Sequence, residues 1–177
     1  MNKSTKNTIL VVTIVVVIVT LLIMANNKSS YFNKIELPND NEVYNRTNQS
    51  YMDTIILVGL SELRIEGVAV LIQPFSSPPI GPEGMELNAF IRRYSHTKYL
   101  IEIGEFGRSD VMNILSHELL HLHQYYTHRL YINSTSVRWY DKVYTDDIPD
   151  YLDRPWEIEA EGLGRILNQK MKKKLYK

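Results

Sequence analysis

A short run past the middle of the chain places a glutamate between two histidines. The run ILSHELLHLHQYY, residues 114–126, holds three of the chain's five histidines. On a helix each residue advances about 100°, so His121 falls about 40° from His117, one turn along on the same face. Two imidazoles in this arrangement can bind one metal ion, while Glu118 on the flank can accept a proton from an activated water. We therefore expect half of a metal site here, with Glu118 as a general base.

The rest of this helix fits a packed element. The opposite face, between about 140° and 220° on the same wheel, is apolar and consists of Met112, Leu115, Leu119, Leu122 and Tyr126. His123 falls at about 240° and points away from the pair. The alternative is an amphipathic helix whose polar face carries histidines for solubility or for hydrogen bonds.

A catalytic zinc site usually has a third protein ligand and an open position. The chain has no cysteine, so that ligand must come from His, Asp or Glu. His128 would need a turn back at the helix end, whereas Glu157 and Glu161 share a face of a later helix. We expect Glu157 to complete the site and Glu161 to support a histidine by a hydrogen bond. The alternative is that these glutamates only decorate a solvated helix.

Together the two motifs resemble a known family. HELLH followed by a later helix with E-x-x-A-E is similar to the gluzincin group of zinc metallopeptidases, and HELLHLHQ resembles the H-E-x-x-H-x-x-Q variant of small zincins. The resemblance covers about residues 85 to 170. It implies a Zn²⁺ cofactor, Glu157 as third ligand and Glu161 beside the first histidine, with Glu where Asp is more usual. It also implies a transition-state stabiliser, for which the candidates are Tyr140, Tyr144, Tyr151 and His128.

The N-terminus predicts a membrane segment. Residues 7–27 form an uncharged run, NTILVVTIVVVIVTLLIMANN, made mostly of Val, Ile and Leu. About 20 mainly apolar residues suffice to span a bilayer, and the run exceeds the apolar core of a typical signal peptide. We expect an uncleaved single-pass anchor at residues 8–25, after a short tail at 1–7, with the catalytic domain on the exported side.

The remaining chain predicts one modest domain. Residues 26–50 are polar and predict a linker before a domain at 51–177. Within it, TIILVGL, IEGVAVLIQPF, NAFIRRY and KYLIEIG predict strands, with RYSHTK as a hairpin turn. Ser109 is the expected cap of the histidine helix, and Asp153 or Arg154 that of the glutamate helix, before Pro155. The expected fold is α+β: a small, mostly antiparallel sheet packed on both helices.

These features predict a membrane-anchored zinc metallopeptidase acting on a peptide or protein substrate. The 20 basic and 20 acidic residues balance, which gives no electrostatic case for nucleic acid as a partner. A strand at KYLIEIG would align the substrate by edge pairing. The first alternative is a catalytically inactive zincin-like protein that binds zinc and acts through protein contacts at a membrane. The second is an anchored structural protein without metal.

Overall fold

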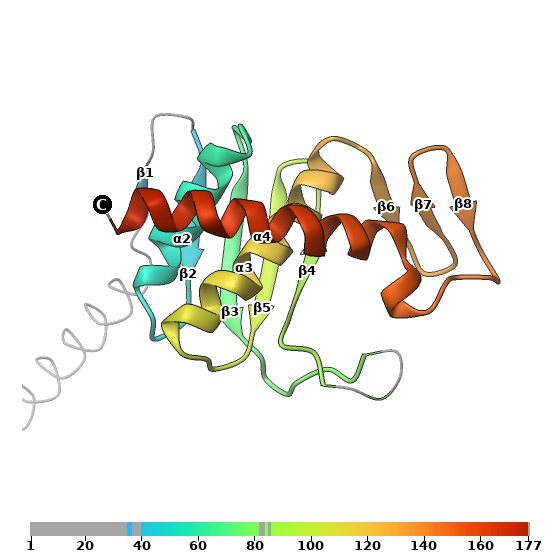
Figure 1. Cartoon of the computed structure of the whole chain (residues 1–177), viewed down its shortest axis with the longest axis horizontal. Helices are drawn as coiled ribbons and strands as arrows, with labels where there is room; N and C mark the ends of the chain where they lie inside the picture. The colour runs from blue at the N-terminus through green and yellow to red at the C-terminus, as the bar shows by residue number, and fades with distance from the viewer. Residues whose placement is uncertain (1–34, 37–39, 82–83, 85, 177) are drawn as a thin grey trace, which may run out of the picture. The chain divides into compact units, whose positions relative to one another are not determined.

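The computed structural model describes residues 35–36, 40–81, 84 and 86–176, which belong to one compact unit (Figure 1). Its architecture is α+β, with the long helices against one face of a sheet. In chain order the elements are β1 (Ile35–Glu36), β2 (Glu42–Asn45), α2 (Tyr51–Glu62), β3 (Ala69–Pro74), β4 (Ala89–Arg93), β5 (Lys98–Ile103), α3 (Arg108–Tyr126), β6 (Leu130–Ile132), β7 (Val137–Trp139), β8 (Lys142–Tyr144), the 3₁₀ turn η1 (Tyr151–Asp153) and α4 (Pro155–Leu175).

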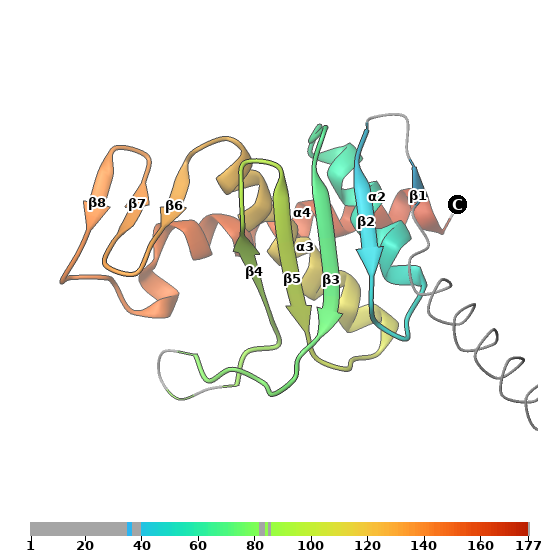
Figure 2. The same ribbon diagram turned by 180° about the vertical axis from the view of Figure 1, so that it is seen from behind.

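The main sheet is mixed, so the expectation of a mostly antiparallel sheet is wrong. Its strand order is β1-β2-β3-β5-β4 (Figure 2). The two central pairings, β2 with β3 and β3 with β5, are parallel, and only the outer pairs β1–β2 and β4–β5 are antiparallel. The β2–β3 pair is parallel because α2 returns the chain to the same end of the sheet, and β3 and β5 are parallel because the chain first passes through β4 on the outer side of β5.

The segment TIILVGL is helical, which corrects the predicted strand. It lies in α2, where Met52, Ile55, Ile56 and Leu60 are buried. Its apolar residues are contiguous because α2 contacts β2 on one side and both α3 and α4 on others. A short, fully buried apolar run has no periodicity that separates a helix from a strand.

The domain also begins earlier than expected. The stretch predicted as a linker contains β1 and β2, and β2 pairs with β3 inside the sheet. The side chain of Asn41 is buried and bridges Ile65 O and the Val68 N–H, which ties this entry segment to the turn after α2. The predicted anchor at 8–25 lies outside the described residues. Among the residues described, no helix is long and apolar enough to cross a membrane.

The hairpin predicted at RYSHTK is confirmed and forms one border of the sheet. β4 and β5 pair antiparallel with Ile91 opposite Ile101. β5 lies between β3 and β4, so KYLIEIG is an internal strand and cannot offer an edge to a peptide. β4 is the edge strand instead, and it packs directly on α3.

The two long helices pack closely on each other. α3 is capped at Gly107 rather than at Ser109, which falls in its first turn. α4 begins at Pro155 with Arg154 as its cap, as the sequence predicts. At Gly164 an added Cβ would lie 3.5 Å from the Cα and N of His117, whereas one at Gly162 would meet nothing. The two backbones therefore come close together beside His117.

The Tyr-rich segment between the helices forms a small sheet that the sequence did not predict. β6, β7 and β8 make an antiparallel meander of three-residue strands. Val137 and Tyr144 are buried from it, and the Tyr144 ring packs edge-on against Trp156 at 5.6 Å between centroids. This contact fixes the meander to the start of α4.

Candidate metal centre

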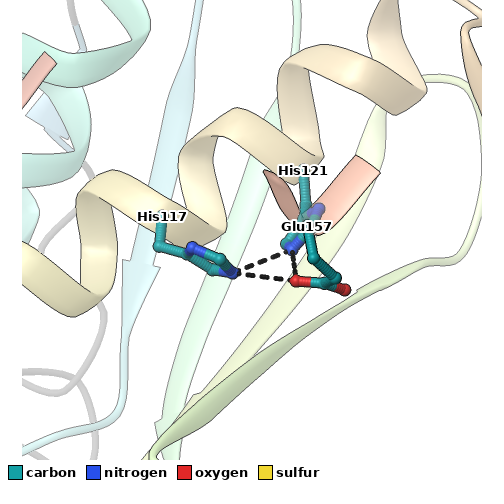
Figure 3. A group of neighbouring side chains, drawn as sticks. All are labelled: His117, His121 and Glu157. Atoms are coloured by element: carbon teal, nitrogen blue, oxygen red, sulfur yellow. Dashed lines mark hydrogen bonds and ion pairs between the residues drawn. The ribbon is translucent and has the colours of Figure 1, made fainter. Parts of the chain in front are cut away.

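Two helices bring three metal-ligating side chains together. His117 and His121 project from α3, and Glu157 extends from the first turn of α4 (Figure 3). The Nε2 atoms of the histidines are 3.0 Å apart, and Oε2 of Glu157 lies 3.2 Å from His117 Nε2 and 3.1 Å from His121 Nε2. The structure therefore joins the three residues that the sequence predicts as ligands, in a group that can hold a metal ion.

The spacing of these atoms fits a small tetrahedral ion. Ligand atoms at about 2.05 Å from Zn²⁺ on tetrahedral corners lie about 3.3 Å from one another. The three separations here, 3.0–3.2 Å, are close to that value. Two imidazole nitrogens and one carboxylate oxygen also match the donor set of a His₂Glu zinc site. The residues present therefore fit zinc, although the geometry alone does not name the metal.

His121 is held by a buried glutamine that the sequence analysis did not assign. Its Nδ1 lies 2.9 Å from Gln124 Oε1, and Gln124 Nε2 donates to Trp156 O at 2.9 Å. Because the carbonyl of Trp156 can only accept, it fixes the orientation of the Gln124 amide. Nδ1 of His121 then carries the proton, and Nε2 is the nitrogen left for a metal. The signal in the sequence was the i, i+3 spacing of the glutamine from His121.

The cluster is electrostatically coupled. Burial by itself would lower the pKa of His121, but the hydrogen bond and charge of Glu157, with the charge of Glu118, raise it to about 9. For Glu157, burial would raise the pKa, but the hydrogen bonds from His117 and His121 hold it far below its ordinary value. The position of Glu157 in the first turn of α4 also favours the charged form. Glu157 is therefore a carboxylate ready to bind a cation.

Glu118 occupies the place expected of a general base. It is buried beside the histidines and is not one of the three clustered ligands. Burial raises its pKa, while the charges of His121 and His117 and the N–H of Ile91 on β4 oppose the rise. A desolvated carboxylate with a raised pKa is the kind of group that accepts and returns a proton near neutral pH.

Glu161 supports His117 only weakly. Its Oε2 lies 3.8 Å from His117 Nδ1, beyond hydrogen-bonding distance, and its side chain is 59% exposed. The closer partner is Arg165, with Nη2 at 2.7 Å from Glu161 Oε1. The structure thus places Glu161 beside His117, as predicted, but its ion-pair partner is the exposed Arg165.

Among the candidate stabilisers, Tyr151 is the one nearest the cluster. It stands on η1, just before α4, close enough for the charge of Glu157 to act on its hydroxyl. Burial, followed by the charge of Glu157, raises the pKa of its hydroxyl. Tyr140 instead bonds Arg129, and Tyr144 packs on Trp156.

The histidines outside the cluster have other partners. His123 contacts Nη2 of Arg129 at 3.1 Å, and burial followed by the charge of Arg129 lowers its pKa. This confirms that it points away from the cluster. His128 has a positive φ of 59° just after α3 and packs against the ring of His96, so it does not turn back to the metal group.

Three adjoining cavities follow β4 past the cluster, and we call them together the β4 cleft. The first, of about 410 Å³, and the second, of about 170 Å³, share Ala89, His117, Glu118 and Tyr151 in their walls. The third, of about 560 Å³, shares Ile91 with the second. His117, His121 and Glu157 therefore all line the second cavity, which adjoins the other two.

Comparison with known proteins adds no assignment to this geometry. The chain matches no protein-family model, and neither a curated protein nor a solved structure matches it.

Proposed function

We propose that this protein is a membrane-anchored zinc metallopeptidase. The observation that carries the proposal is the convergence of His117, His121 and Glu157 within 3.2 Å of one another, with Glu118 buried beside them. A purely structural role would not require three ligand atoms at tetrahedral spacing together with a desolvated carboxylate in the same cleft.

The chain's own residues divide the reaction between them. Zinc, when bound, supplies Lewis-acid chemistry that activates water and polarises the scissile carbonyl. His117, His121 and Glu157 would hold the ion, and Glu118 would accept the proton of the attacking water. Glu118 then returns that proton to the nitrogen of the departing amine, so no net proton is consumed at the site.

Tyr151 is positioned to assist at the substrate oxygen. Its wall position in both cavities around His117 and Glu118 places a phenol donor beside the reacting groups. A hydrogen bond donated to an oxygen that gains negative charge strengthens in the transition state. Because the pKa of Tyr151 is raised, the hydroxyl keeps its proton at neutral pH and remains a donor.

The edge of β4 supplies a surface for an extended peptide. The N–H of Gly104 donates to Asn88 O at the end of the β4–β5 ladder. Hydrogen-bonded pairs alternate along antiparallel strands, so the backbone groups of Ala89, Ile91 and Arg93 point away from β5. The Ile91 N–H already interacts with Glu118, so a substrate strand would pair with this edge through the main chain of Ala89 and Arg93, which moves the substrate-aligning role from KYLIEIG to AFIRR.

The membrane part of the proposal rests on the sequence alone. The apolar run at 8–25 is long enough to span a bilayer, and by the numbering nine residues, 26–34, separate it from β1, where the described domain begins. The active-site cleft would then act on substrates near a membrane surface.

The test measures metal and turnover separately. The full chain, purified in detergent without a histidine tag, is analysed for zinc by mass spectrometry and assayed on fluorogenic peptide pools. We expect about one zinc per chain, loss of zinc in His117→Ala, and retained zinc in Glu118→Gln with hydrolysis reduced by about 10³-fold or more.

The matched control is His128→Asn, because His128 is an exposed histidine with a positive φ that asparagine tolerates. It should keep both zinc and activity. A zinc-loaded Glu118→Gln protein that cuts peptides at the wild-type rate would refute the mechanism. Absence of bound zinc in the wild-type chain would refute the zinc site.

A further inference from the structure

The β4 cleft ends in a pocket rich in cationic and aromatic side chains, which we call the arginine pocket. It lies between the β4–β5 hairpin and β6, and Arg92, Arg93, Tyr94, His96 and Tyr131 contribute to its walls. β4 and β6 are both edge strands, each of a different sheet. The pocket is therefore open to an extended chain that enters between the two sheets.

The positive charge of this pocket is not neutralised from within. Among the described residues, no Asp or Glu lines it, and no carboxylate forms an ion pair with Arg93. The guanidinium of Arg93 donates only to Ser95 O and His96 Nδ1. Arg92 has one long contact, at 3.8 Å, with Glu102.

A third arginine, Arg138, lies at the rim of the arginine pocket. The guanidinium of Arg138 on β7 stacks over the Tyr131 ring at 5.6 Å. Tyr94 and Tyr131 are both largely exposed, at 69% and 44%. Exposed tyrosines beside arginines whose charge is largely unneutralised are typical of recognition surfaces rather than of solvated loops.

The pocket is connected to the metal group. Ile91, Tyr125 and Ile132 line both this pocket and the cavity that contains His117 and His121. Burial, then the charges of Glu118 and Glu157, raise the pKa of the Tyr125 hydroxyl, while the charge of Arg93 opposes them. Tyr125 thus lies between the acidic metal end and the cationic end of one cleft.

We infer that the arginine pocket binds a carboxylate of the peptide substrate, so that the proposed enzyme selects acidic peptides. The inference rests on the proposed function, because it assigns the substrate of that same cleft. Guanidinium groups in a partly desolvated cleft bind carboxylates through charge-assisted hydrogen bonds. The tyrosines would cover the apolar part of the same residue or of its neighbour.

The register of β4 limits where the carboxylate lies. Ile91 faces Glu118, and Arg93 is two residues further along the same strand, roughly 7 Å away. A peptide paired with β4 would therefore present its acidic side chain roughly two or three residues from the bond that is cut. A free C-terminal carboxylate at that distance would satisfy the same groups.

The test uses binding rather than turnover. Fluorescein-labelled octapeptide pools, amidated at the C-terminus and carrying either Glu or Gln at one scanned position, are titrated into the zinc-loaded, full-length Glu118→Gln protein. Fluorescence anisotropy should show tighter binding of the Glu pool by about tenfold at one position. Non-amidated Gln pools, scanned in the same way, report whether a terminal carboxylate serves instead.

Three variants locate the effect. Arg93→Gln should abolish the preference for the carboxylate, and Arg93→Lys should keep part of it because the charge remains. The matched control is Arg64→Gln, since Arg64 is exposed in the turn after α2 and lines none of the cavities described above. Equal binding of Glu and Gln pools at every position, together with no gain from a free C-terminus, would overturn the inference. So would a preference that survives in the Arg92→Gln/Arg93→Gln double variant.

The outcome is separable from that of the proposed function. A wild-type chain that cleaves no peptide, but whose acid preference depends on Arg93, would remove the peptidase and keep the pocket. A wild-type chain that cleaves neutral and acidic peptides at equal rates, unaffected by Arg93→Gln, would keep the peptidase and remove the pocket.

Discussion

The two histidines of the metal group, His121 and His117, have different surroundings. On one side His121 is 8% exposed and is tied through Gln124 to the backbone of Trp156. On the other side, the second ring nitrogen of His117, Nδ1, has among the described residues only the distant Glu161, which is itself paired with Arg165 toward solvent. The ring of His121 is therefore oriented from behind by buried hydrogen bonds, whereas the ring of His117 has only helix packing behind it.

This difference indicates where the precision of the site resides. The Gln124 bridge joins α3 to the first turn of α4, so it orients His121 and positions Glu157 at the same time. His117 also lines the cavity of about 410 Å³ in the β4 cleft, on the side through which the proposed substrate would enter. A rigid side for the ligands and an open side for the substrate are both needed in a catalytic metal site.

The largest effect we predict is the pH dependence that His121 gives to the stability of the metal-free fold and to zinc affinity. Its folded pKa of about 9 exceeds the unfolded value of 6.5, so the proton stabilises the metal-free fold fully below pH 6.5, and this contribution is lost as pH rises through 9. Zinc binding requires the deprotonated ring, so zinc affinity should rise over the same range, by about tenfold per pH unit for one released proton.

Thermal unfolding of chelator-treated protein between pH 6.5 and 9 tests the predicted loss of stability. Competition titration with a zinc indicator over the same range tests the predicted rise in zinc affinity. The midpoint of unfolding should fall while affinity rises. Opposite slopes of the two curves are the signature, and a metal-free protein that becomes more stable toward pH 9 would contradict the coupling of His121 with Glu157.

The second prediction concerns the hydrogen bonds through which Gln124 holds His121. Gln124→Ala leaves Nδ1 of His121 without its partner and removes the side-chain donor from the carbonyl of Trp156, both in a buried position. We expect zinc affinity to fall by about 10- to 100-fold and stability to fall by about 1–3 kcal/mol. Indicator competition and denaturant unfolding measure the two quantities. Gln124→Glu is the informative companion, since it restores an acceptor for His121 but not a donor for Trp156.

The third prediction concerns the helix packing that sets His117. Valine at Gly164 and at Gly162 has the same helix propensity, so the difference between the two variants reports packing. A Cβ at Gly164 would already touch the His117 backbone at 3.5 Å, so the larger side chain of Gly164→Val should press on α3, lose about 1–3 kcal/mol and weaken zinc binding. Gly162→Val faces open space and should change neither by a comparable amount. Equal unfolding free energies of the two variants would contradict close packing at His117.

The smallest effect belongs to Glu161. Its 3.8 Å contact with His117 and its exposure leave a screened interaction, so Glu161→Gln should change zinc affinity by less than about threefold. A loss as large as that of Gln124→Ala would show that the two sides are equivalent after all.

The metal group was predictable because its signal is local. The spacing of His117, Glu118 and His121 on one helix determines their directions without any knowledge of the rest of the fold. Glu157 required only a second helix with a carboxylate near its start. Gln124 could have been assigned by the same helical arithmetic, one turn beyond His121.

The sheet was less predictable because its pattern depends on partners far along the chain. The run at Thr54–Leu60 is apolar throughout, and only the packing of α2 between sheet and helices decides that it is helical. Once α2 is a helix, β2 and β3 become parallel, so one misassigned element changed the predicted topology. The strands β6–β8, three residues each, are too short to leave a periodic trace.

The position of Glu157 has a consequence for chain entropy. It lies 36 residues beyond His121, and the β6–β8 meander lies wholly within that interval. A metal bound by both residues would close this loop, as a disulfide does, and remove conformations from the unfolded chain. The three short strands, which bury little apolar surface of their own, would then owe part of their order to the ion at the base of the loop.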